Sequence, residues 1–210
     1  MAAVDLSPPT HRERKKQATR RAIHAAALQL VERHGLAGAT IEAISEQAGV
    51  APRTFWSYFT SKEEAVLDHD PERPERLRLA LLSRPFGEDA LTSVQAVLEE
   101  DIVSRATDRA VSIRIAELVR REPELRAAVS ATFDQVGQAL VTAVAERTGQ
   151  NPERDVYPGL LVGSACVACR VAFLRWTGLP GRPGLRTLLG EAFHQLAAGL
   201  SGPLPRESRR

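Results

Sequence analysis

The segment 40–59, TIEAISEQAGVAPRTFWSYF, constrains the fold of this chain more than any other stretch. It reads as two short helices joined at Gly49: Thr40 can cap the first helix, and Gly49 tolerates a positive φ. Ala48 is small enough to let the two helices approach, and Pro52 suits the first turn of the second helix. Two short helices joined by a tight glycine-containing turn form a helix-turn-helix, whose second helix typically enters the major groove of DNA.

The second of these helices carries more large side chains than one buried face can hold. Phe55 and Phe59 are four residues apart and can anchor the helix in a core. A generic helical hairpin with every aromatic packed inside is the alternative, but one helix cannot bury Trp56 and Tyr58 together with both phenylalanines. The side chains expected to reach DNA from the N-terminal part of this helix are Arg53, Thr54, Trp56 and Ser57.

The rest of the chain follows helical periodicity, and no segment shows sustained period-two alternation, so a β-sheet is not expected. A helix is expected over 12–34, ended by Gly35, and residues 1–11 are expected to be disordered. A further helix should open at Ser61, which with Glu64 resembles a capping box, and run to about His69. Later helices are expected over 76–82, 89–105, 108–120, 123–147, 156–177 and 185–200.

Pro71 and Pro74 interrupt the chain after the last N-terminal helix and mark the expected domain boundary. The sequence therefore predicts an all-α protein of two domains. The first, over 12–72, is a three-helix helix-turn-helix DNA-binding domain, and the second, over 73–202, is a helical ligand-binding and dimerisation domain.

Positive charge is concentrated beside the helix-turn-helix, where residues 12–21 contain six arginines and lysines against one acid, Glu13. Such a cluster indicates phosphate contact, in particular by Arg14, Lys15 and Lys16, although a solvated helix start would look the same. By this reading no apolar run approaches the roughly 18–20 residues that a membrane helix needs, and the N-terminus lacks an apolar signal core. We therefore expect a cytoplasmic protein without a membrane partner.

The run ATIEAISEQAGVAPRTFWSYFTSKEEAVL resembles the DNA-binding domain of TetR-family repressors in the order and spacing of its elements. The resemblance covers about residues 12–70 and implies binding to double-stranded operator DNA. It implies groove contacts by Arg53, Thr54 and Trp56, phosphate contacts by Thr40, Tyr58 and Lys62, and a basic arm over 12–21 that follows the adjacent backbone or minor groove. Many members have glycine where this chain has Arg53, which could bind guanine or pair with a phosphate.

A second resemblance concerns the C-terminal domain. The stretch 168–176, ACRVAFLRW, is similar to the penultimate helix of actinobacterial regulators of the mycofactocin type, which sense acyl-CoA-like ligands. By this resemblance a small apolar or acyl-CoA-like effector would fill a cavity between the helices and release the repressor from DNA. The positions of apolar residues along the expected helices suggest which side chains line this cavity: Val97, Ile102, Ile115, Val119, Phe133, Val136, Leu140 and Trp176.

The helices expected over 156–177 and 185–200 carry more apolar surface than one core face uses. The family resemblance implies a homodimer in which this pair of helices from each subunit forms a four-helix interface. Two recognition helices about 34–36 Å apart would then read a palindromic operator.

Cys166 and Cys169 form a C-x-x-C, which raises the possibility of a redox or metal site. They lie within an apolar helix and have no second pair or histidine beside them, so two buried structural thiols are the main interpretation and thiol sensing is the alternative. The histidines show no metal-ligand spacing, and no nucleotide-binding or catalytic motif is present. We therefore expect no metal, no cofactor and no catalysis, against the alternative of a helical enzyme or interaction protein.

Overall fold

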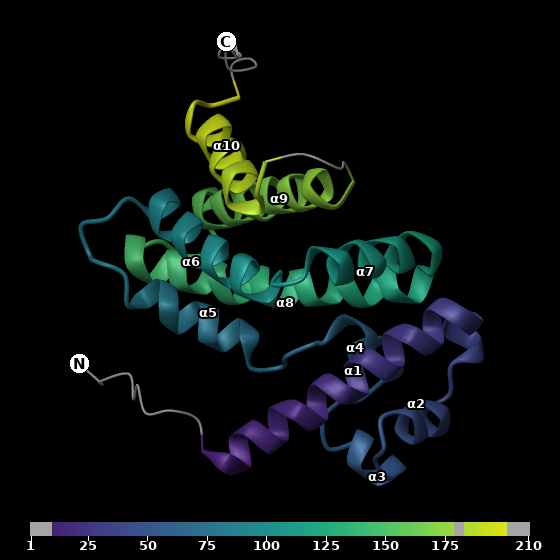
Figure 1. Cartoon of the computed structure of the whole chain (residues 1–210). Coiled ribbons are helices and arrows are strands. Elements are labelled where there is room, and N and C mark those ends of the chain that lie inside the picture. Colours follow the sequence, from purple (N-terminus) through teal and green to yellow (C-terminus); the bar gives the residue numbers. More distant parts are fainter. Residues whose placement is uncertain (1–9, 179–182, 201–210) are drawn as a thin grey trace. The chain divides into compact units, whose positions relative to one another are not determined.

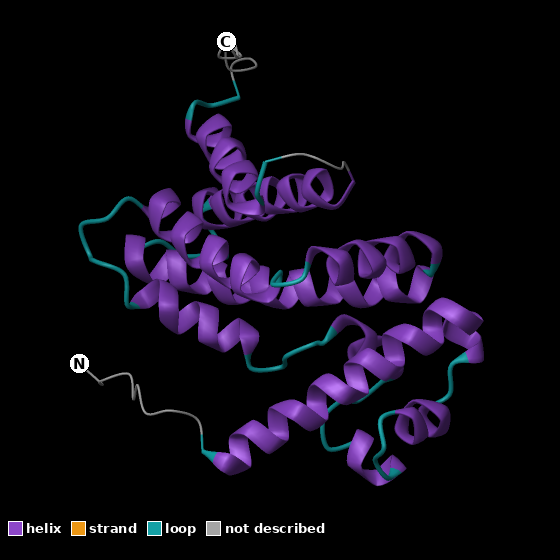
Figure 2. Ribbon diagram, in the orientation of Figure 1, coloured by secondary structure: helices purple, strands orange, loops and turns teal. Residues whose placement is uncertain are grey.

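The computed structural model describes residues 10–178 and 183–200, and every regular element within these ranges is an α-helix (Figure 2). The expected all-α fold is therefore confirmed. In chain order the helices are α1 (His11–Gly38), α2 (Ile41–Gln47), α3 (Pro52–Phe55), α4 (Lys62–Leu67), α5 (Arg73–Leu82), α6 (Ala90–Arg105), α7 (Arg109–Arg121), α8 (Pro123–Thr148), α9 (Val156–Gly178) and α10 (Leu185–Ala197).

The first helix starts earlier than the expected disordered segment allows. Thr10 caps α1 through a reciprocal pair of hydrogen bonds, in which the Glu13 N–H donates to the Thr10 hydroxyl and the Glu13 carboxylate accepts from the Thr10 N–H. Two unpaired backbone donors are satisfied in this way, so helix is favoured from His11 onward. The rest of the expected disordered segment, residues 1–9, lies outside the described residues.

Local side-chain caps also open the later helices. The Thr40 hydroxyl accepts from the Ala43 N–H at 3.1 Å at the start of α2, as expected. Ser61 caps α4 by accepting from the Glu64 N–H at 3.1 Å, but the Glu64 carboxylate accepts from the Thr60 N–H at 2.8 Å. In a capping box the Glu64 carboxylate would accept from the N–H of Ser61 itself, so the second bond of the expected capping box is displaced by one residue, to Thr60.

By its contacts the chain divides into two units. The first comprises Met1–His69 together with Leu118–Val129, and the second comprises Asp70–Glu117 and Ser130–Arg210. The first division falls between His69 and Asp70, close to the expected boundary after residue 72. The grouping of the α7–α8 corner with the N-terminal helices was not indicated by the sequence.

In the first unit α1 packs against both α2 and α4 (Figure 1). The helices meet through fully buried side chains, which include Ile23, Leu28, Val31, Ile44, Phe55, Phe59 and Val66. Gly35 has φ +70° and interrupts α1, so the last turn of the helix leaves the main axis. The Glu122 carboxylate accepts from the Leu36 N–H at 3.2 Å immediately after this break.

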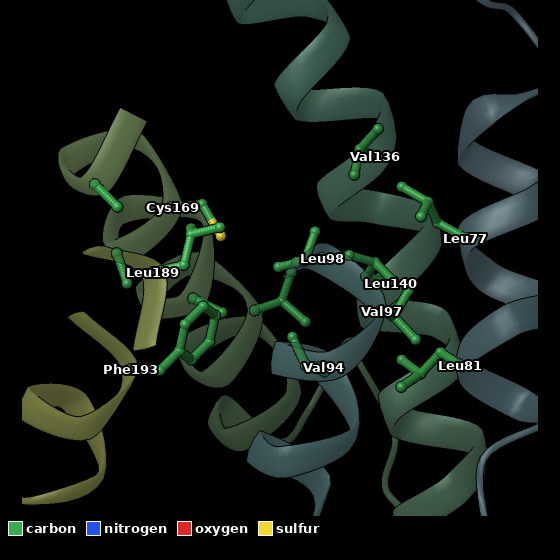
Figure 3. Packing of buried hydrophobic residues seen from close by; sticks show 14 of the residues in the cluster. Leu77, Leu81, Val94, Val97, Leu98, Val136, Leu140, Cys169, Leu189 and Phe193 are labelled. Atoms are coloured by element: carbon green, nitrogen blue, oxygen red, sulfur yellow. The ribbon is translucent and has the colours of Figure 1, made fainter. Parts of the chain in front are cut away.

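The core of the second unit is built around α6, which contacts α5, α9 and α10. Figure 3 shows the α6 side chains Val94, Val97 and Leu98 between those of α9 and α10 on one side and those of α5 and α8 on the other. The buried face of α5 contributes Leu77 and Leu81, which are four residues apart and therefore share one helical face.

One expectation about α9 is wrong. Among the described residues this helix is long and apolar enough to cross a membrane by length and composition, although no such run was expected. The core helix of a soluble protein passes the same test, and α9 packs along α10 and α6, burying Val162, Ala165 and Cys169. Its length and composition are therefore weak indications of a membrane span.

Candidate nucleic-acid interface and regulatory core

The helix-turn-helix forms as the segment 40–59 predicts. Gly49 has φ +67° in the turn, and the Val50 N–H donates to the Ser45 carbonyl at 3.0 Å, which closes the corner. Pro52 lies in the first turn of α3. The α-helical part of α3 is short, but the Phe59 N–H donates to the Phe55 carbonyl at 3.0 Å and so extends the coiled backbone beyond it.

The aromatic side chains of this segment divide between core and solvent. Phe55 and Phe59 are 0% and 1% exposed, whereas Trp56 is 55% exposed and its ring meets Phe55 edge-on at 5.5 Å. Arg53 and Ser57 are exposed beside Trp56, while Thr54 and Tyr58 are half-buried. The predicted reading residues therefore offer a polar and aromatic surface that the core does not use.

Two of the residues predicted to contact phosphates, Thr40 and Lys62, also make hydrogen bonds within the protein. Thr40 is exposed and caps α2. The Lys62 ammonium donates to the Leu36 carbonyl at 2.5 Å and to the Ala39 carbonyl at 3.2 Å, which ties the start of α4 to the end of α1. An ammonium has three N–H donors, so Lys62 retains one for a phosphate. Its role in DNA binding stays a prediction.

The basic segment is helical, as expected from residue 12 onward. Arg14, Lys15 and Lys16 lie in the first turns of α1 and are exposed. Arg20 is different: it donates from Nε to Asp68 Oδ1 at 2.8 Å, from Nη1 to the Tyr58 carbonyl at 3.4 Å and from Nη2 to the His69 carbonyl. Its guanidinium also lies 4.4 Å from the centre of the Phe59 ring.

Arg20 is thus a structural residue that clamps α1 to the ends of α3 and α4. Sequence reasoning grouped it with the basic cluster, because nothing local in the sequence distinguishes it from Arg21, which is exposed.

The residues predicted to line an effector cavity have different environments. Val97, Val136, Leu140 and Trp176 belong to the core of the second unit, and Ile102 packs against that core. Ile115 and Val119 are half-buried, and Phe133 is 39% exposed. Val119 falls in the first unit and the other seven fall in the second. The structure therefore gathers five of the eight around one core, and effector binding by the set stays a prediction.

The two cysteines are free thiols. Burial raises the pKa of both thiols, and that of Cys169 rises to about 12. A thiol with such a pKa carries little thiolate at neutral pH, and the thiolate is the reactive form. This environment fits structural thiols better than thiol sensing. Among the described residues no cluster of three potential metal ligands occurs.

A continuous apolar stripe on α9 faces away from the core. Its large side chains are between 42% and 77% exposed: Val156, Tyr157, Leu160, Val167, Val171 and Leu174. Apart from Tyr157, and with Gly163 included, the positions recur every three or four residues along the helix. Gly163 lies within the stripe and is also exposed. The α10 helix packs on another side of α9 (Figure 1), so within this chain the stripe has no covering element among the described residues.

Comparison with known proteins agrees with this architecture. Residues 23–67 match the family described as bacterial regulatory proteins, tetR family, and residues 89–201 match the MftR C-terminal domain. The HTH-type transcriptional regulator TcmR of Streptomyces glaucescens is 32% identical over 174 residues, which cover 80% of this chain and 77% of TcmR.

Solved structures share the fold at low sequence identity. The fatty acid degradation regulator FadR from Bacillus halodurans has a TM-score of 0.59 at 20% identity, covering 87% of this chain and 96% of that one. The regulator FadR from Bacillus subtilis, solved in complex with stearoyl-CoA, has a TM-score of 0.55 at 18% identity, covering 85% and 98%. The helix-turn-helix geometry, both family matches and the relationship to TcmR lead to one conclusion: the chain belongs to the TetR family of DNA-binding transcription regulators and has the MftR type of C-terminal domain.

Proposed function

We propose that this protein is a homodimeric repressor that binds a palindromic operator and is released from it by a small apolar or acyl-CoA-like effector. The observation that carries the DNA-binding half is the division of the α3 segment between core and solvent. Trp56, Arg53 and Ser57 are exposed side by side while Phe55 and Phe59 hold the segment in the core. Trp56 uses only one edge of its ring against Phe55, and the rest of this half-exposed side chain, beside an arginine, suits a DNA groove.

Within this proposal the exposed residues of α3 read the bases, and the surrounding ones fix the register on the backbone. Arg53, Thr54, Trp56 and Ser57 enter the major groove. Thr40, Tyr58 and the remaining N–H of Lys62 bind phosphates, and Arg14, Lys15 and Lys16 extend that contact along the start of α1.

A mobility-shift titration with DNA from the upstream region of the gene tests the DNA-binding half. Arg53→Ala should weaken specific binding about 5- to 150-fold, corresponding to about 1–3 kcal/mol for one base contact. Arg154→Ala is the matched control, because it removes the same charge from an exposed position in the other unit. Equal affinities for the two variants would contradict base reading by Arg53.

The α9 stripe supports the dimer. An apolar face of this length is seldom left in water by a soluble monomer, and a second copy of the same helix offers a face of matching chemistry. Gly163 would allow the two copies of α9 to approach closely. The α10 helix, which packs along α9, would complete a four-helix interface.

Sedimentation equilibrium tests the dimer. Leu160→Glu or Val167→Glu should yield a monomer with greatly reduced operator affinity, since a charge would be buried at the interface. Leu79→Glu is the control, because Leu79 is similarly exposed at 53% but lies on α5. If both stripe variants remained dimers, the interface would have to lie elsewhere.

The effector half rests on the MftR-type domain and on the core around Val97, Val136 and Trp176. An effector that binds more tightly to the dimer state that does not fit the operator lowers the affinity for DNA. The size of this effect is set by the difference between the effector's affinities for the two states. Release of the operator by decanoyl-CoA or by neutral apolar compounds would support it. We propose the cytoplasm as the place of action and no membrane partner, because a second subunit accounts for the apolar face of α9.

A further inference from the structure

A largely buried ion pair lies at the edge of the core of the second unit, where the other buried side chains are almost entirely apolar. Arg73 at the start of α5 and Asp101 on α6 leave only 15% and 7% of their side chains exposed. Among the described residues Asp101 is the one charged residue that is buried as a whole.

The pair adjoins the residues that the sequence suggests for effector binding. Asp101 lies four positions after Val97 and therefore on the same face of α6, and it precedes Ile102 directly. Arg73 lies four positions before Leu77, on the buried face of α5. The positive charge of Arg73 also acts on the thiols of α9, lowering the pKa of Cys166 and Cys169 against the larger effect of burial. Helices α5, α6 and α9 thus converge on the pair.

The hydrogen bonds of the pair leave part of its capacity open. Arg73 donates from Nε at 3.0 Å and from Nη2 at 2.7 Å, and both bonds end on the same oxygen, Asp101 Oδ2. Within the described part of the chain, Asp101 Oδ1 and the Nη1 group of Arg73 make no hydrogen bond to protein. An acceptor and a donor are therefore available side by side at the edge of an apolar core.

Stability alone does not account for such a pair. Removing two charges from water costs about as much as their attraction returns, and well-packed apolar residues of similar volume usually serve a core equally well or better. A polar pair at this place becomes useful when it hydrogen-bonds a ligand, because a ligand without matching groups leaves the pair unsatisfied and is rejected.

The charges of the pair itself decide which head group fits. Arg73 and Asp101 balance each other, and the nearby Glu99 and Glu100 lie on other sides of α6, where they share Arg186 of α10 at 2.8 Å and 3.6 Å. A carboxylate or phosphate would have to displace Asp101 from Arg73, whereas a neutral hydroxyl can donate to Asp101 and accept from Arg73 without separating the two.

We propose that Arg73 and Asp101 form the polar recognition element of the effector site, and that it takes a neutral apolar molecule carrying a hydroxyl or phenol group. The proposal rests on effector control as proposed above and narrows its chemistry away from acyl-CoA, whose head group is anionic.

The test compares four probes on the full chain: 2-naphthol, naphthalene, 2-naphthoate and decanoyl-CoA. The first three share one ring system and differ only in the head group. Binding is measured by the shift in Tm, which needs no DNA, and by release of the operator. The wild-type protein should bind 2-naphthol about 10- to 100-fold more tightly than naphthalene, the discrimination expected of hydrogen bonds to charged groups, and more tightly than both anions.

The variant Arg73→Met with Asp101→Leu removes both charges together, so no single charge is left buried and the fold should persist. It should bind 2-naphthol no better than naphthalene. The control replaces the pair Glu75 and Arg78, whose side chains are 59% and 27% exposed, in the same way, as Glu75→Leu with Arg78→Met, and should keep the preference for 2-naphthol.

A preference of the wild type for an anion, equal binding or no binding of the three naphthalene compounds, or an unchanged preference in the double variant would overturn the proposal. Absence of any operator binding by the wild type would instead count against the proposed function, and the Tm shifts would still decide the role of the pair.

Discussion

Replacement of Arg20 by alanine should destabilise the DNA-binding unit far more than replacement of its neighbour. Arg20 makes three hydrogen bonds, to Asp68 and to the carbonyls of Tyr58 and His69, and stacks on the Phe59 ring. Arg21 has the same charge, one residue further along α1, but is exposed. Comparing the alanine variants of Arg20 and Arg21 therefore separates the effect of losing the Arg20 contacts from the effect of losing one positive charge.

The magnitude follows from the contacts. The Arg20 side chain is 25% exposed, so water competes for its partners and each hydrogen bond contributes about 1 kcal/mol net. The ring contact adds about 0.5 kcal/mol. Arg20→Ala should therefore lower the free energy of unfolding by about 3 kcal/mol, which for a chain of this length corresponds to a fall in Tm of about 6–12 °C.

Urea and thermal unfolding followed by far-UV circular dichroism measure this difference. Arg21→Ala should stay within about 0.5 kcal/mol of the wild type, as surface substitutions usually do. Arg20→Lys should recover only part of the stability, because an ammonium cannot reproduce the three-way fork of the guanidinium. If Arg20→Ala and Arg21→Ala unfolded at the same urea concentration, the clamp would contribute nothing and the reasoning would be refuted.

Three further substitutions test other parts of the structure. Ser45 is fully buried, and its hydroxyl finds no hydrogen-bond partner in the described part of the chain. Ser45→Ala should therefore raise the free energy of unfolding by about 1 kcal/mol, and a lower urea midpoint would contradict this. The hydrogen bond from Arg84, together with one from Ser93, lowers the pKa of Glu88 to about 2, below its unfolded value. The contribution of the Glu88 carboxylate to stability is complete above about pH 5 and is lost as pH falls towards 2. Glu88→Gln should therefore have a lower free energy of unfolding than the wild type above about pH 5, and this difference should vanish towards pH 2. A difference that did not change with pH would show that the charge of Glu88 does not stabilise the fold. Because burial raises the pKa of Cys169 to about 12, iodoacetamide at pH 8 should modify it far more slowly in the native than in the urea-unfolded protein, as mass spectrometry would show; equal rates would indicate a reactive thiol.

Much of the fold could be read from the sequence because helices are specified locally. Thr40 caps α2 through a residue three positions away, and Gly49 adopts the positive φ that its turn requires. The exposed position of Trp56 beside buried Phe55 follows from helical geometry alone. These features depend on neighbours within one or two turns, so the order of residues is sufficient to predict them.

Other roles depend on residues that only folding brings together. Arg20 meets Asp68 across 48 positions, Lys62 meets Leu36 across 26, and Arg73 meets Asp101 across 28. A basic side chain in a sequence looks the same whether it will bind a phosphate, cap a helix or enter a core, because the partner that decides is set by packing. The sequence by itself determined most of the helices and the helix-turn-helix segment. Only the tertiary structure decided which of the charged side chains hold the protein together.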